Sequence, residues 1–209
     1  MLSLKEQIED EYIPVYSDHP SFFDWEANST LFGIFIGIND VGNAYGEANA
    51  SLVLSLVVQE YAGLVDTLYQ TGARNFLFLN VPPVDRSPGT LIQGSTVEAL
   101  EASAIAAYNA NVNKIAANLS STYSDAFTSV FDTNAAFTQV LDDPCSHPET
   151  CPYMNTTNYC EYYANGTPSW YTFYQNCSLP VDEYFWLNTL HPTFRMMNVT
   201  AQEIALQLS

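Results

Sequence analysis

The chain has 209 residues, 47% of them hydrophobic, which is enough to bury a core and excludes a disordered tail. Five Lys and Arg stand against 23 Asp and Glu, so the formal charge is −18 and the isoelectric point is near 4.1. Such a field repels nucleic acids and anionic membrane surfaces, which bind proteins through cationic side chains. We expect a soluble acidic protein without nucleic-acid or membrane partners.

The first half of the chain alternates between strand and helix patterns. Residues 31–38 form a continuous apolar run, typical of a strand buried on both faces of a parallel sheet. Apolar residues at helical spacing predict a helix over 48–70, and Gly72 ends it. Residues 75–81 predict a second buried strand, closed by two prolines.

The second half continues the alternation. Ser95 and Glu98 match a capping box, which predicts a helix from there to about residue 119. We further expect a strand at 129–132 and helices at 134–141 and 199–208. Strands that alternate with helices indicate an α/β domain with a parallel sheet, whose functional edge lies at the carboxyl ends of the strands. We draw no internal boundary between residues 1 and 209.

The sequence gives opposing indications of the cellular compartment. Its longest apolar run, residues 52–58, is too short to cross a bilayer, and residues 1–11 lack the basic and apolar regions of a signal peptide. Seven Asn-x-Ser/Thr acceptor sequons, however, favour the secretory pathway. They begin at Asn28, Asn49, Asn118, Asn155, Asn165, Asn176 and Asn198.

All four cysteines, Cys145, Cys151, Cys160 and Cys177, lie in one non-helical segment over residues 143–181. Their even number and polar surroundings predict two disulfides, and the sequence leaves all three pairings open. A zinc site that includes His147 has the wrong spacing, because no Cys-x-x-Cys pair is present. We expect neither a metal nor a cofactor.

Two polar positions are candidates for chemistry. Asn39 follows the first predicted strand, where its amide either donates to an oxyanion or merely begins a turn. His191 precedes Pro192 near the last helix and acts either as a general base or as a structural residue. The other two histidines, His19 and His147, have no such context, and we expect both at the surface.

Three segments together carry a resemblance to a known family. They are Leu31-Phe-Gly-Ile-Phe-Ile-Gly-Ile-Asn-Asp-Val-Gly-Asn43, Leu79-Asn-Val-Pro-Pro-Val-Asp85 and Asp182-Glu-Tyr-Phe-Trp-Leu-Asn-Thr-Leu-His-Pro-Thr193. From about residue 30 onward the chain resembles the SGNH (GDSL-type) hydrolases. Within them it resembles the fungal branch classed as carbohydrate esterase family sixteen, which are secreted acetyl esterases. The resemblance implies a flavodoxin-like three-layer fold with strand order 2-1-3-4-5.

The resemblance also implies residue roles. Asn39 matches the oxyanion-hole Asn, and His191 matches the base that takes a proton from a serine nucleophile. The family usually places an Asp three residues before that His, where this chain has Asn188. An amide oxygen holds the imidazole but lacks the charge that stabilises imidazolium. Asp182 or Glu183 substitutes for the missing Asp, or the His works in a dyad.

The nucleophile block of the family, Gly-Asp-Ser, does not occur in the 209 residues. None of the early serines follows a strand or a Gly-Asp pair, and the later Ser95 belongs to the predicted capping box. The early serines are Ser3, Ser17, Ser21 and Ser29. If residues 31–38 are the family's third strand, the first two strands are missing and the third becomes an exposed edge. We interpret the chain as the C-terminal portion of a single SGNH domain, truncated at its N-terminus.

These observations predict the C-terminal part of a secreted serine esterase that hydrolyses acetyl esters of carbohydrate or small esters by acyl transfer. Without its nucleophile the chain as written is expected to be inactive. The alternative is a non-catalytic secreted glycoprotein derived from such an esterase. Trp170, Tyr171 and Trp186 either stack on sugar rings or pack in the core. We expect a monomer.

Overall fold

The computed structural model describes residues 2–209 and divides the chain into two compact units. The sheet unit holds the residues through Val81 together with Ala106–Phe131. The loop unit holds Pro82–Ile105 and Asp132–Ser209. Helix α6 (Ser95–Thr122) contributes residues to both units. The expectation of one domain stays a prediction.

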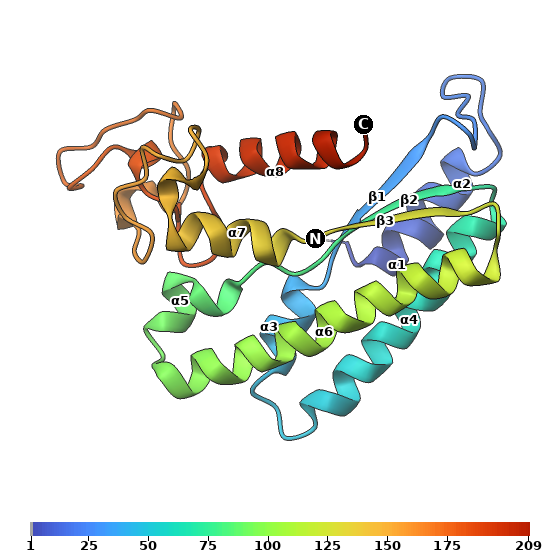
Figure 1. Ribbon diagram of the computed structural model, residues 1–209, viewed down its shortest axis with the longest axis horizontal. Coiled ribbons are helices and arrows are strands. Elements are labelled where there is room, and N and C mark those ends of the chain that lie inside the picture. Colours follow the sequence, from blue (N-terminus) through green and yellow to red (C-terminus); the bar gives the residue numbers. More distant parts are fainter. Residues whose placement is uncertain (1) are drawn as a thin grey trace. The chain divides into compact units, whose positions relative to one another are not determined.

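The sheet unit is built on three parallel strands, β1 (Leu31–Phe35), β2 (Asn75–Leu79) and β3 (Phe127–Phe131), in the order β1-β2-β3 (Figure 1). The register is regular, with Leu31 opposite Asn75 and Asn75 opposite Phe127. Helix α4 (Ala50–Gln70) connects β1 to β2, and α6 precedes β3. The predicted α/β class with a parallel sheet is confirmed.

The prediction that the first strand is buried on both faces is wrong. Ile34 is buried and Phe32 half-buried, but Leu31 and Phe35 on the opposite face are 42% and 40% exposed. Aromatic side chains cover the face of Phe32, whose ring the rings of Tyr12 and Trp25 contact edge-on. Among the described residues β1 pairs only with β2 and forms an edge of the sheet, as expected.

The N-terminal residues form a helical segment that the sequence analysis did not assign. It consists of α1 (Leu4–Glu6), a π-helical stretch η1 (Gln7–Tyr12) and α2 (Ile13–Tyr16). A capping box between Ser3 and Glu6 begins it, since each residue's side chain bonds the other's backbone nitrogen. Burial of Ile8 anchors the segment to the unit.

Several element boundaries differ from the predictions. The first strand ends at Phe35, and α3 (Ile38–Ala44) begins where an extended run to 38 was expected. The predicted stop at Gly72 is confirmed by its φ of +107°. In α6 the amide of Glu98 donates to the carbonyl of Gly94, so the capping position is Gly94 and Ser95 is already helical.

Helix α4 is long and apolar enough to cross a membrane by length and composition, which the run of residues 52–58 alone did not indicate. Five of its side chains are nevertheless buried in the protein, and the ring of Tyr61 lies 6.2 Å from that of Phe78 in β2. The buried residues are Leu54, Tyr61, Leu64, Val65 and Leu68. Their helical spacing places them on one face of α4, and this face packs inside the sheet unit.

The loop unit contains two longer helices, α7 (Thr133–Asp142) and α8 (Phe194–Gln207), and the short helix α5 (Pro88–Leu91). The loops of this unit contain four single 3₁₀ turns: η2 (Val84–Arg86), η3 (Pro144–Ser146), η4 (Glu161–Tyr163) and η5 (Val181–Glu183). Helix α8 begins five residues before the prediction because Thr193, in extended conformation after Pro192, starts it.

Both predicted disulfides are present in the loop unit, and the structure selects one of the three pairings. Cys145 bonds to Cys151, and Cys160 bonds to Cys177. The second bond adjoins a small core formed by Tyr163, Cys177, Val181 and Tyr184. The segment therefore has its own buried centre despite its lack of long helices.

Candidate functional site

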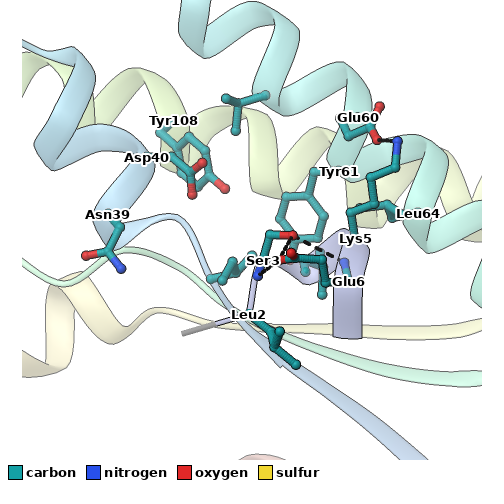
Figure 2. A pocket seen from close by; sticks show the side chains of 13 residues that line it. Leu2, Ser3, Lys5, Glu6, Asn39, Asp40, Glu60, Tyr61, Leu64 and Tyr108 are labelled. Atoms are coloured by element: carbon teal, nitrogen blue, oxygen red, sulfur yellow. Dashed lines mark hydrogen bonds and ion pairs between the residues drawn. The ribbon is translucent and has the colours of Figure 1, made fainter. Parts of the chain in front are cut away.

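Asn39 lies in the first turn of α3 and is exposed. It lines a pocket of about 350 Å³ inside the sheet unit, between α3, α4, α6 and the N-terminal segment. Figure 2 shows Asn39, Asp40 and Tyr108 toward one side of this pocket and Tyr61 toward the other. The amide of Asn39 is thus accessible to a ligand, which a donor to an oxyanion requires.

Gly37 sets the direction of α3. It caps the helix with a φ of +114°, a left-handed conformation that L side chains rarely adopt, and its carbonyl accepts from the amide of Val41 at 2.9 Å. A Cβ at Gly37 would lie 2.3 Å from the ring of Tyr108, which is fully buried. The backbone turn that presents Asn39 therefore depends on glycine.

Tyr61 is an orphaned polar group at this pocket. Its side chain is buried, and its hydroxyl has no hydrogen-bond partner among the described residues. Burial, with a smaller contribution from Tyr108, raises the pKa of Tyr61 far above its ordinary value, so the phenol is neutral at any working pH. The group costs the free energy of an unmade hydrogen bond.

Replacing Tyr61 by phenylalanine is therefore expected to raise the free energy of unfolding by about 1 kcal/mol, because the ring stays and the unpaired hydroxyl is removed. Urea denaturation of the two proteins measures the difference. Tyr153→Phe is the matched control: its hydroxyl accepts from Thr193 and from the amide of Met196, so this change should destabilise. A loss of stability in Tyr61→Phe would show that the hydroxyl has a partner.

His191 lies on an exposed loop of the loop unit, where Asn188 holds its ring. The side-chain oxygen of Asn188 accepts from the amides of Leu190 and His191, at 3.0 and 2.9 Å. These two donors identify it as the amide oxygen, and the same oxygen lies 3.1 Å from Nδ1 of His191. In the neutral form of the imidazole this contact assigns the proton to Nδ1 and the lone pair to Nε2, the tautomer that a general base needs.

One alternative partner for His191 is engaged elsewhere: Asp182 is buried, and its carboxylate lies 2.5 Å from the guanidinium of Arg195. The contact seen at the imidazole is with Asn188. The role of Asn188 as the residue that orients His191 stays a prediction.

The loop that bears His191 is supported from α5. The amide of Gly89 donates to the carbonyl of Thr189 at 2.9 Å, and a Cβ at Gly89 would lie 2.9 Å from that same oxygen. Inside the loop, the amide of Leu187 donates to the carbonyl of His191 at 2.8 Å. Glycine at position 89 therefore permits the close approach that fixes this loop.

Two carboxyl groups of the loop unit, Glu101 and Asp85, have raised pKa values. Thr90 bonds to the buried Glu101 at 2.6 Å. Burial, and secondarily the charge of Asp85, raises the pKa of Glu101. Burial is also the main reason why the pKa of Asp85 is raised, with a smaller contribution from Glu98. Both groups thus favour the protonated form more than in an unfolded chain.

Since the pKa of Glu101 is higher in the folded state, its contribution to stability is present at low pH and is lost as pH rises above the ordinary glutamate value of about 4.3. Glu101→Gln removes this loss, so the stability of the variant relative to the wild type should increase from about pH 4 to about pH 7. Thermal unfolding at several pH values measures it, and parallel curves for the two proteins would refute the assignment.

The remaining candidate residues are engaged in other contacts or line the Asn39 pocket without a free hydroxyl role. His19 stacks on Trp25, and His147 lies 3.2 Å from Glu203. Ser3 lines the pocket of Asn39, but its hydroxyl belongs to the capping box. Within residues 2–209 no group of three or more His, Cys, Asp or Glu is arranged to hold a metal ion. Asn39 belongs to the sheet unit and His191 to the loop unit.

A parallel α/β sheet, a glycine-led turn to Asn39 and a His191 ring held through Nδ1 are features of one class of hydrolase. The family model of the GDSL-like lipases/acylhydrolases matches residues 4–204, and the chain belongs to this family. It is 30% identical over 197 residues to a protein of Thermothelomyces thermophilus named acetylesterase. That match covers 89% of this chain but 55% of the acetylesterase, so the chain spans about half the length of the curated relative it matches.

Proposed function

We propose that this chain supplies the base and an oxyanion donor of a serine ester hydrolase that removes acetyl groups from carbohydrate or small esters. The observation that carries the proposal is the contact between His191 Nδ1 and the side-chain oxygen of Asn188. Family membership supports hydrolysis of an acyl ester, and the name of the relative, acetylesterase, supports acetyl as the acyl group.

In this proposal His191 Nε2 takes the proton of a serine hydroxyl while the serine oxygen attacks the ester carbonyl. The tetrahedral oxyanion accepts a hydrogen bond from the amide of Asn39. Collapse releases the alcohol, which takes the proton from His191, and leaves an acetyl-serine. Water then attacks this ester and gives a proton to His191; collapse releases acetic acid, and the serine oxygen takes the proton back from His191. Asn188 keeps the imidazole oriented throughout but adds no negative charge to it.

The serine itself is not assigned within this chain, because Gly-Asp-Ser is absent from the 209 residues. We propose that the nucleophile lies in a segment like the part of the acetylesterase that the chain does not span. The alternative, a non-catalytic glycoprotein derived from such an esterase, is favoured by the same absence. The two proposals differ in one respect: only the first requires a Gly-Asp-Ser segment to act with His191.

We also propose that the protein is secreted and glycosylated, which two disulfides support. Five sequon asparagines are exposed: Asn28, Asn49, Asn118, Asn165 and Asn176. The other two are half-buried and engaged: Asn155 accepts from the amides of Thr157 and Asn158, and Asn198 donates to Glu149. Glycans on the five and not on these two would support the assignment.

The test compares the chain alone with the chain joined to the part of the acetylesterase that lies outside the matched region. Hydrolysis of 4-nitrophenyl acetate is measured for both. The esterase proposal requires turnover by the joined protein and none by the chain alone. A folded joined protein without turnover would overturn it and leave the non-catalytic alternative.

A further inference from the structure

Exposed aromatic rings gather on the segment between Cys160 and Cys177 of the loop unit. Trp170, Tyr171 and Phe173 are each more than half exposed, and we call these three residues the aromatic platform. Apolar rings that stay in water over a contiguous area are uncommon on proteins and mark binding surfaces. The third candidate ring of the sequence analysis, Trp186, is buried and belongs to the core.

The platform is held in place by the beginning of α8. The ring of Trp170 stacks on that of Phe194, with centroids 4.7 Å apart and an angle of 23° between the planes. Tyr171 meets the same Phe194 ring edge-on, at 5.6 Å. One face of the indole is therefore occupied, while the side chain as a whole remains 62% exposed.

The backbone beneath the platform is also fixed. The Cys160–Cys177 disulfide closes the segment, and the amide of Val181 donates to the carbonyl of Thr172 at 3.0 Å. The hydroxyl of Tyr163, itself buried, donates to the carbonyl of Leu179 and accepts from the amide of Tyr174. Because this loop is already ordered, binding of a ligand here costs little conformational entropy.

A pocket of about 160 Å³ adjoins the platform within the loop unit. Trp170 and Phe194 form part of its wall, and Pro192 and Thr193 form another part. Pro192 directly follows His191 in the chain, so part of the pocket wall comes from the residues next to the proposed base.

The composition of the segment around the aromatic platform indicates which kind of ligand would bind there. Residues 153–178 contain one charged side chain, Glu161, although the whole chain carries a net charge of −18. Their polar groups are hydroxyls and amides, which donate to and accept from neutral ligands. The segment contains no Lys or Arg, and Arg195, which lies 5.8 Å from the ring of Tyr171, is paired with Asp182 and Glu149. This disfavours a phosphate or an anionic lipid, and the net charge of the chain disfavours a second copy.

We propose that the aromatic platform binds a neutral sugar ring, whose C–H face packs on Trp170 while its hydroxyls bond to the surrounding amides and hydroxyls. This proposal rests on the proposed function, because it takes the bound sugar to be the part of the substrate that carries the ester. It makes Trp170 a residue that determines which alcohol part of the ester is accepted.

Tryptophan fluorescence tests the proposal on the chain itself. Trp170 is the exposed one of the three tryptophans, since Trp25 and Trp186 are 5% and 1% exposed. Titration with xylotetraose, plain and partly acetylated, should shift the emission to shorter wavelength and reduce quenching by acrylamide. Trp170→Ala should weaken binding, measured by calorimetry, about tenfold or more. Phe22→Ala, which removes an exposed ring from the sheet unit, should leave it unchanged.

Two outcomes overturn the proposal: no spectral response to either sugar, or binding that Trp170→Ala does not weaken. A double variant, Asn165→Gln with Asn176→Gln, removes the flanking sequons and is titrated in parallel. Binding confined to this variant would assign the platform to the chain's own glycans and also overturn the proposal. Because binding of plain xylotetraose involves no hydrolysis, its failure is distinct from a failure of the esterase proposal.

Discussion

Gly37→Ala is expected to lower the free energy of unfolding by about 3 kcal/mol or more. Two costs add: an alanine at a φ of +114° is strained, and its Cβ would lie 2.3 Å from the ring of Tyr108. That ring is fully buried, so the surrounding core must shift to make room. Urea denaturation followed by circular dichroism measures the loss.

Gly63→Ala is the matched control. Gly63 lies inside α4, nothing lies within 4 Å of the position of its Cβ, and its φ is not positive. Alanine there should raise the free energy of unfolding by about 0.5 to 1 kcal/mol, because alanine favours helix over glycine. A Gly37→Ala protein as stable as the wild type would show that the turn to Asn39 does not need glycine.

His191→Ala should abolish ester hydrolysis by the joined protein, with kcat reduced about ten-thousand-fold or more. The imidazole is the group proposed for proton transfer, and Asn188 contacts it at Nδ1. Hydrolysis of 4-nitrophenyl acetate measures kcat and KM separately, and a loss in kcat is expected, since alanine leaves the ester-binding surfaces intact.

His147→Asn serves as the control for His191→Ala. His147 lies in the same unit and contacts Glu203 at 3.2 Å, away from the loop of His191. Its replacement should leave kcat within about twofold of the wild type. Equal losses in both variants would indicate damage to the fold of the loop unit and would contradict the role of His191.

Much of the fold is predictable from the sequence, because the apolar runs that begin at Leu31 and Asn75 indicate strands and the helical spacing between them indicates a crossover. The one-sided exposure of β1 is not predictable from its run of apolar residues, since it depends on what else covers the sheet. The N-terminal helical segment was missed although Ser3 and Glu6 present a capping box.

Some features of the candidate site are likewise predictable from the sequence, and others are not. The motif spacing predicts Asn39 and His191 as site residues, and the structure shows how Asn188 contacts the imidazole. The supporting glycines were not predictable: Gly37 and Gly89 matter because Tyr108 and Thr189 approach them, and such approaches arise from tertiary packing. That Trp170 is exposed and Trp186 buried likewise depends on tertiary packing, which sequence patterns do not contain.

The central claim, that His191 activates a serine supplied from outside these 209 residues, is tested most directly by labelling with a fluorophosphonate that reacts with activated serines. Mass spectrometry then locates the label in the chain alone and in the joined protein. The account predicts no label on the chain alone and one label, on the serine of Gly-Asp-Ser, in the joined protein, lost with His191→Ala. A label on any serine of the chain alone would contradict it and place the nucleophile within these residues.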